Sequence, residues 1–206
     1  MKKELTPKVL KHFKKITDNA SPARAILQCV YYDEEGSIVA TDSHRLLKVR
    51  NFHNYDKPFA INLDTAKLVE GNYPDTNRLM FSLDDAQFRI KVDIDDLARA
   101  IRAFGSPQYP YLKMNIRNSG IEIASVQSAV TVRMRIEAKV ENKKYDLLGF
   151  NGKYLLDALM FTKDLIPKLE PKVVDMYLSD SAVRPFILAT KNTDYQYMIT
   201  PTRVWN

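Results

Sequence analysis

The chain passes twice through the same order of segments, an amphipathic helix followed by several short strands. The first helix is predicted over 6–19, where Thr6 can act as the N-cap and Pro7 suits the first helical position. The second is predicted to begin at Asp93 or Asp95 and to end at Phe104. Because each helix has one apolar face to bury, the repeated order predicts an α+β protein of two domains, 1–81 and 82–206.

Short strands and a few helices fill the rest of the chain. Alternation of apolar and polar residues is clearest over 130–140, and Asn151 can cap a further helix over 153–162. A short helix is also predicted over 64–69. The other predicted strands are 25–32, 37–41, 45–50, 58–62, 112–116, 120–125, 146–150, 173–179, 185–190 and 195–199.

Composition is that of a globular protein without membrane spans or disulfides. The 206 residues are 45% apolar and 27% charged, and no run approaches the ~18 apolar residues of a transmembrane helix. The one cysteine, Cys29, lies in an apolar run and is predicted to be a buried structural thiol. The charged N-terminus lacks the apolar core of a signal peptide, so we expect a cytoplasmic protein with no membrane partner.

The net charge is +6, and its meaning for binding partners depends on where the charged residues lie. Lys8, Lys11 and Lys15 share the face of the first helix that lies opposite its apolar stripe, and Arg99 and Arg102 do the same on the second. Cations on a helix face can bind duplex phosphates without reading bases. The alternative is that these side chains only solvate an outer helix face.

Four stretches, in order, resemble the β sliding clamp, the processivity subunit of bacterial DNA polymerase III. V-A-T-D-S-H-R-L at 39–46 resembles the motif A-T-D-G-H-R-L of the clamp's middle domain. E-G-N-Y-P-D-T-N-R-L at 70–79 resembles D-G-R-F-P-D-Y-R-R-V, which leads to the last domain. F-N-G-K-Y-L-L-D-A-L at 150–159 and Y-M-I-T-P-T-R-V at 197–204 resemble a helix start and the C-terminal tail of that last domain.

The resemblance implies two DNA-clamp-like domains, each with helices on one face of an antiparallel sheet. It covers the middle and last of the clamp's three domains, and the middle one is curtailed. In the family the helices line a hole that holds duplex DNA. Two domains per chain would need a trimer to close a six-domain ring, so a homo-oligomer is an expected partner.

The resemblance also implies a hydrophobic groove between the two domains that accepts a peptide from replication or repair proteins. Ser43 replaces a family glycine, Thr200 and Thr202 replace methionines, and Phe81 replaces a proline. The alternatives are a packing seam between domains and a groove filled by Trp205. The matching positions are Thr41, Ser43, His44, Arg45, Leu46, Asn151, Tyr154, Met198, Ile199, Pro201, Arg203 and Val204.

Catalytic chemistry has little support in the sequence. None of the three histidines is spaced from another as metal ligands are, and Ser43 and His44 would point to opposite sides of an extended chain. The aspartates at 84–85 and 93–96 would suit a magnesium nuclease, but a helix cap and a solvated turn explain them better. We therefore expect no catalytic residues, no metal and no cofactor.

Three functional hypotheses result. The first is a clamp-like processivity or scaffold factor that tethers replication or repair partners to DNA. The second is a monomeric, clamp-derived decoy or regulator of replication that does not close a ring. The third, a metal-dependent nuclease, is the least supported.

Overall fold

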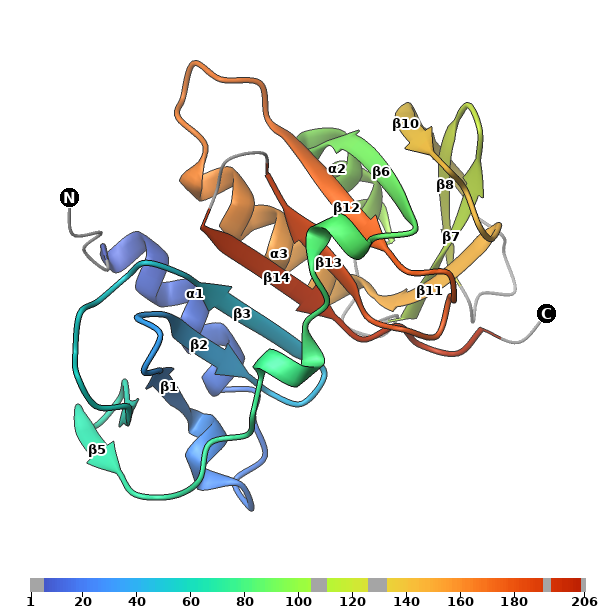
Figure 1. Cartoon of the computed structure of the whole chain (residues 1–206). Helices are drawn as coiled ribbons and strands as arrows, with labels where there is room; N and C mark the ends of the chain where they lie inside the picture. The colour runs from blue at the N-terminus through green and yellow to red at the C-terminus, as the bar shows by residue number, and fades with distance from the viewer. Residues whose placement is uncertain (1–5, 105–110, 126–132, 191–193, 205–206) are drawn as a thin grey trace. The chain divides into compact units, whose positions relative to one another are not determined.

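A computed structural model describes residues 6–104, 111–125, 133–190 and 194–204 (Figure 1). The chain divides into two compact units, Met1–Met80 with Asn192–Met198, and Phe81–Lys191 with Ile199–Asn206. A segment near the C-terminus, Asn192–Met198, thus belongs to the first unit. The division into domains 1–81 and 82–206 stays a prediction. Within the described residues, no helix is both long and apolar enough to span a membrane.

The described residues of the first unit form one α-helix on a sheet. Helix α1 (Pro7–Thr17) begins at Thr6, whose side chain accepts from the Val9 amide, and Pro7 follows the cap as predicted. Phe13 and Ile16 of α1 are fully buried, and so is Cys29, as predicted. The strands follow the order β14–β3–β2–β1–β4–β5: β14 Tyr195–Ile199, β3 Arg45–Val49, β2 Ile38–Thr41, β1 Cys29–Tyr32, β4 Phe59–Asn62 and β5 Lys67–Val69.

Two predictions in this unit were wrong in detail. The predicted helix over 64–69 is a turn followed by β5, because the Asn62 side-chain oxygen accepts from the amides of Asp64 and Thr65. That turn returns the chain antiparallel to β4. The predicted strand over 25–32 begins as a 3₁₀ helix, η1 (Ala25–Gln28), and only its second half is β1. A second short 3₁₀ helix, η2, covers Asn77–Leu79.

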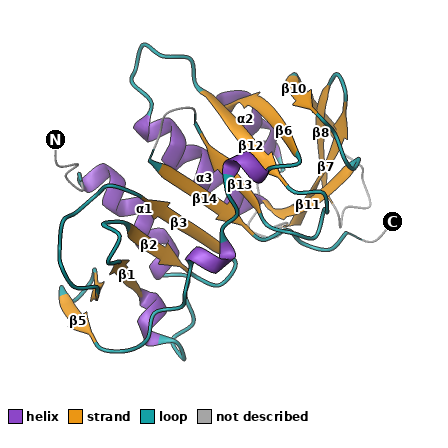
Figure 2. Cartoon of the chain, viewed as in Figure 1, coloured by secondary structure: helices purple, strands orange, loops and turns teal. Residues whose placement is uncertain are grey.

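In its described residues, the second unit has strands of two sheets and two α-helices (Figure 2). Helices α2 (Ile94–Ala103) and α3 (Gly152–Leu165) pack against each other. A 3₁₀ turn, η3 (Leu83–Asp85), precedes the first strand. One sheet has the order β10–β6–β12–β13: β10 Ala138–Glu141, β6 Phe88–Asp93, β12 Val173–Leu178 and β13 Phe186–Ala189. The other is β11–β7–β8–β9: β11 Leu147–Asn151, β7 Tyr111–Arg117, β8 Gly120–Ser125 and β9 Arg133–Ile136.

The alternating stretch predicted as one strand over 130–140 is divided between the two sheets. Its first part, up to residue 132, lies outside the described residues. The rest forms β9, which pairs with β8, and β10, which pairs with β6. Glu137 lies between them and lets the chain pass from one sheet to the other. Strand β6, which the sequence reading missed, alternates buried and outward residues from Phe88.

Candidate functional site

The outward face of α1 carries the candidate DNA-binding lysines of the first unit. Lys8, Lys11 and Lys15 are all exposed, and the helix contains no acidic residue. The amine of Lys14, on the same helix, pairs with Asp64 and, at 3.0 Å, with Asp18, and these bonds raise its pKa. All the charged side chains that α1 itself carries are basic. His12, next to Lys11 in the sequence, is only 3% exposed and belongs to the core side of the helix.

Helix α2, in the second unit, carries acidic as well as basic side chains. Arg99 is exposed, but its guanidinium pairs with Asp96 at 2.9 Å. Arg102 lies 3.0 Å from the Met160 sulfur. Asp95 pairs with Lys163 of α3. The two helices predicted to contact DNA therefore differ in the residues they carry, since α2 includes Asp95 and Asp96 and α1 has no acidic residue of its own.

The turn between β2 and β3 holds the first motif of the predicted groove. Thr41 donates its hydroxyl to the Arg45 carbonyl at 2.7 Å and accepts from the Ser43 amide at 3.2 Å. The Asp42 carboxylate accepts from the His44 and Arg45 amides, both at 3.0 Å. Ser43 has φ +75°, a left-handed conformation that favours glycine, the residue the family motif has there. Ser43 and His44 remain exposed at the tip of this turn.

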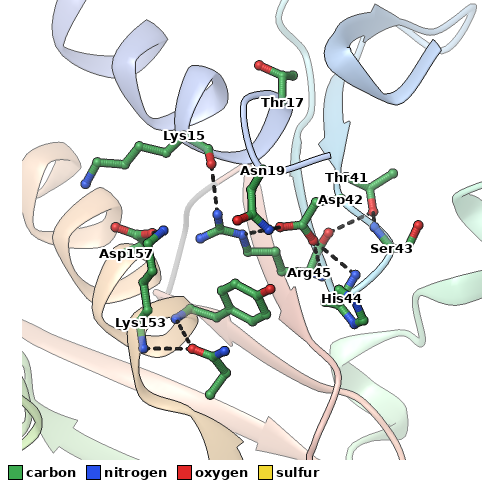
Figure 3. Close-up of polar contacts among 12 residues, drawn as sticks. Lys15, Thr17, Asn19, Thr41, Asp42, Ser43, His44, Arg45, Lys153 and Asp157 are labelled. Atoms are coloured by element: carbon green, nitrogen blue, oxygen red, sulfur yellow. Dashed lines mark hydrogen bonds and ion pairs between the residues drawn. The ribbon is translucent and has the colours of Figure 1, made fainter. Parts of the chain in front are cut away.

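Arg45 fixes this turn from within the first unit (Figure 3). Its Nε donates to Asp42 at 2.9 Å, and its Nη2 donates to the Lys15 carbonyl at 2.9 Å. Its Nη1 lies 3.4 Å from the Tyr197 hydroxyl of β14. Arg45 is 1% exposed and Leu46 is fully buried, so both hold the turn rather than present a surface. Met198 and Ile199, in β14, are likewise buried.

The other predicted groove residues lie in the second unit. Asn151 caps α3, because its side-chain oxygen accepts from the Lys153 amide at 2.9 Å and the Tyr154 amide at 3.2 Å. Its predicted capping role is confirmed. Tyr154 and Pro201 are half-buried, and Arg203 is exposed.

The C-terminal tail lies against β11. The Thr202 amide donates to the Gly149 carbonyl at 3.0 Å. A side chain at Gly149 would meet the Thr202 carbonyl and Val204 at 2.3 Å, so the close approach requires glycine. A pocket of about 380 Å³ opens beside this contact and includes two predicted residues, Arg203 and Val204. The other lining residues are Leu147, Gly149, Ala182, Val183 and Thr202.

The sequence did not reveal several residues that form the turn and the pocket. Tyr197 stands within the tail stretch, but nothing in the sequence pairs its hydroxyl with Arg45. Ala182 and Val183 lie in a loop without a motif, although an exposed valine is a weak signal. Trp205, which the sequence reading placed in the groove as an alternative, lies outside the described residues.

The acidic cluster has structural partners. Asp93 is the N-cap of α2, accepting from the Asp95 amide at 2.8 Å and the Asp96 amide at 3.0 Å. Asp95 and Asp96 pair with Lys163 and Arg99. In the part of the chain that the structure describes, no group of three His, Cys, Asp or Glu residues could hold a metal ion. The cap predicted for Asp93 is confirmed.

The fold is that of a DNA clamp in reduced form, with helices packed on antiparallel sheets in two successive units. The first unit has a single α-helix in its described residues. Solved bacterial sliding clamps share this fold. The Bacillus subtilis clamp superposes with a TM-score of 0.75 at 23% identity, covering 96% of this chain and 62% of that one. The Caulobacter crescentus β sliding clamp gives a TM-score of 0.77 at 18% identity, covering 95% and 63%.

Curated β sliding clamps are also similar in sequence, which confirms the resemblance drawn from the four motifs. The Lactococcus lactis protein is 29% identical over 67% of this chain. The Streptococcus pneumoniae protein is 27% identical over 88%. No family model matches the sequence. The chain spans 36% of the length of the Lactococcus protein and 58% of that of the Streptococcus protein.

Proposed function

We propose that the chain is a clamp-like processivity or scaffold factor that holds replication or repair proteins on duplex DNA. The observation that carries the proposal is α1 on a clamp fold: three exposed lysines on a helix without acidic residues, with the opposite face buried. Lysines on flexible stems bind phosphates without fixing a register. Such contacts suit a protein that moves along DNA, and the mechanism requires no bond chemistry.

The salt dependence of duplex binding tests this role of α1. We expect Lys8→Ala/Lys11→Ala/Lys15→Ala to make the log–log salt slope shallower by about 2.7, since each lost phosphate contact removes about 0.9. The matched control, Lys57→Ala/Lys67→Ala/Lys168→Ala, removes three other exposed lysines. Equal changes in the two triple variants would show that α1 is not a DNA-binding face. We expect Arg99→Ala/Arg102→Ala to have the smaller effect, because Asp96 already neutralises Arg99.

We further propose that the pocket beside the tail binds an apolar side chain of a partner peptide. Leu147, Val183 and Val204 supply apolar walls, and the exposed Arg203 is placed to hold a carboxylate or backbone carbonyl. In the first unit, the exposed Ser43 and His44 are proposed peptide contacts, and Thr41 and Arg45 position their turn. Because Thr200 and Thr202 replace methionines of the family tail, we expect a preference for a smaller or more polar anchor.

A peptide array read with the labelled full chain tests the pocket. Val183→Asp and Arg203→Ser should each remove binding to the peptides that the unaltered chain selects. The control is Leu169→Asp, because Leu169 is fully exposed and is not among the pocket's lining residues. If Leu169→Asp abolishes binding equally, or if Val183→Asp leaves it intact, the pocket is not the peptide site.

The second candidate function is a monomeric decoy or regulator of replication. The curtailed first unit favours it, because a unit with a single sheet and one α-helix in its described residues offers less surface for closing a ring. Light scattering separates the two candidates. A stable species near three times 23.7 kDa supports a trimeric ring, whereas a strict monomer at all concentrations supports the decoy.

A further inference from the structure

We propose that the outward face of strands β7, β8 and β9 binds a single strand of nucleic acid. Arg117 and Arg135 would hold phosphate groups, and Tyr111 would stack on a base. This surface is separate from the lysines of α1, and the inference stands whether or not α1 binds duplex DNA. It lies entirely within the second unit.

Strand alternation places the relevant side chains on one face. On β7, Leu112, Met114 and Ile116 are buried, so positions 111, 113, 115 and 117 point outward. Directly paired residues point to the same side, and the register opposes Asn115 to Glu122 and Glu122 to Arg135. The face therefore carries four cations, Lys113, Arg117, Arg133 and Arg135, and Glu122.

A pocket of about 390 Å³ lies at the end of this face, lined by Arg117, Ser119, Gly120, Ile121, Glu122 and Arg135. Arg135 donates only to a neutral group, the Ser119 hydroxyl at 3.0 Å. Across the part of the chain that the structure describes, the Arg117 guanidinium has no hydrogen-bond or ion-pair partner. Two guanidinium groups around one pocket repel each other until an anion lies between them, and their planar forks match phosphate oxygens.

Glu122 is the one acid among these outward side chains and offsets only one of the four positive charges. Its carboxylate accepts from Asn115 at 3.0 Å and lies 3.9 Å from Arg133, which is 60% exposed. On the other sheet of the same unit, Arg89 and Lys139 both lie 2.5 Å from Glu141, and Arg89 also lies 3.8 Å from Asp175. Those two cations have acidic partners, which is the difference from the arginines of the pocket.

Tyr111 favours a single strand over other polyanions. It is 43% exposed and lies on the outward side of β7, about 20 Å from Arg117 at ~3.4 Å per residue. Single-strand binding proteins combine a basic surface with aromatic rings on which unpaired bases stack. Bases in a duplex are not available for such stacking. An acidic polypeptide would engage the arginines but would not need the tyrosine.

Fluorescence anisotropy with a labelled single-stranded oligonucleotide tests the proposal on the full chain. We expect Arg117→Ser/Arg135→Ser to make the salt slope shallower by about 1.4, from about 0.7 per lost contact on a single strand. Tyr111→Ala should weaken binding at least about fivefold, the lower end for loss of one stacked base. Arg117→Lys/Arg135→Lys keeps the charge and should retain the slope.

The matched control is Arg78→Ser/Arg184→Ser, which removes two arginines that are 87% and 69% exposed. An equal loss of slope in this control overturns the proposal. The proposal is also overturned if Tyr111→Ala leaves the affinity unchanged and polyglutamate displaces the bound strand. That result would indicate an acidic polypeptide as the ligand. Lys8→Ala/Lys11→Ala/Lys15→Ala should lose binding to duplex DNA and keep binding to the single strand. Failure of the proposed role of α1 and failure of this inference can therefore be told apart.

Discussion

The Arg45 Nε donates to the Asp42 carboxylate at 2.9 Å, and both side chains are fully buried. Asn19 donates to the same carboxylate at 2.9 Å, and Arg45 also reaches the Lys15 carbonyl. The ion pair thereby joins the C-terminal end of α1 to the β2–β3 turn. Within the first unit it links the proposed DNA-binding helix to the turn that carries Ser43 and His44.

Breaking this pair should destabilise the first unit strongly. We expect Arg45→Ala to lower the free energy of unfolding by roughly 3–5 kcal/mol, because a buried carboxylate would lose its partner. Urea denaturation measures the change. Arg78→Ala is the control, since its pair with Asp75 is exposed and should contribute about 1 kcal/mol or less. A loss of similar size in both variants would contradict a structural role for Arg45.

Removing the Asp93 cap should weaken α2. Asp93 accepts from two amides of the first turn, so we expect Asp93→Ala to cost about 1 kcal/mol in thermal unfolding. Asp93→Asn should restore most of the loss, because asparagine caps helices equally well. If the asparagine variant were as unstable as the alanine variant, the carboxylate charge rather than the cap would be the cause.

A methyl group at Gly149 should displace the tail. In Gly149→Ala the new carbon would meet the Thr202 carbonyl and Val204, and we expect a loss of about 1–3 kcal/mol. Hydrogen exchange of the Thr202 amide, which bonds to the Gly149 carbonyl, should become faster. The Met114 amide, in the ladder with Ile123, serves as the internal reference. An unchanged Thr202 amide would show that the tail is not held by this contact.

Glu141 should make stability fall at acid pH. Hydrogen bonds from Lys139 and Arg89 lower the pKa of Glu141 from its ordinary value of 4.5. A carboxylate with a lowered folded-state pKa stabilises the protein above its unfolded-state pKa, and this is lost as pH falls through the folded value. Glu141→Gln should therefore be less stable than the unaltered chain at pH 7, with the difference shrinking below about pH 4.5. Glu170→Gln, which alters an exposed carboxylate, is the control.

The fold could be predicted where local signals agreed. Thr6, Asp93 and Asn151 are caps because their oxygens accept from amides one turn ahead, a short-range interaction that sequence displays. Predictions failed where tertiary pairing decided the outcome. The Asn62 turn redirected a predicted helix into β5, and the stretch after 132 was shared between two sheets. Periodicity cannot show which partner strand each half finds.

The candidate site was predictable only in outline. The resemblance supplied Arg203 and Val204 of the pocket and the tail stretch that contains Thr202, but Leu147, Ala182 and Val183 come from segments without a motif. Arg45 matched a family motif and proved to be buried. A match between motifs does not show whether a side chain is exposed. The difference between α1 and α2 depends in part on the Asp96–Arg99 pair, whose i, i+3 spacing is visible in the sequence. The arginine pocket at β7–β8–β9 required the strand register.

Retention on DNA circles tests the central claim, that this chain holds partners by linkage to duplex DNA. The full chain is incubated with a nicked circular plasmid in the presence of a clamp loader, and half of the sample is then linearised. We predict that the protein stays on the circle at high salt and leaves the linear form. Equal retention on both forms, lost from both as salt rises, would contradict the claim and indicate ordinary electrostatic binding.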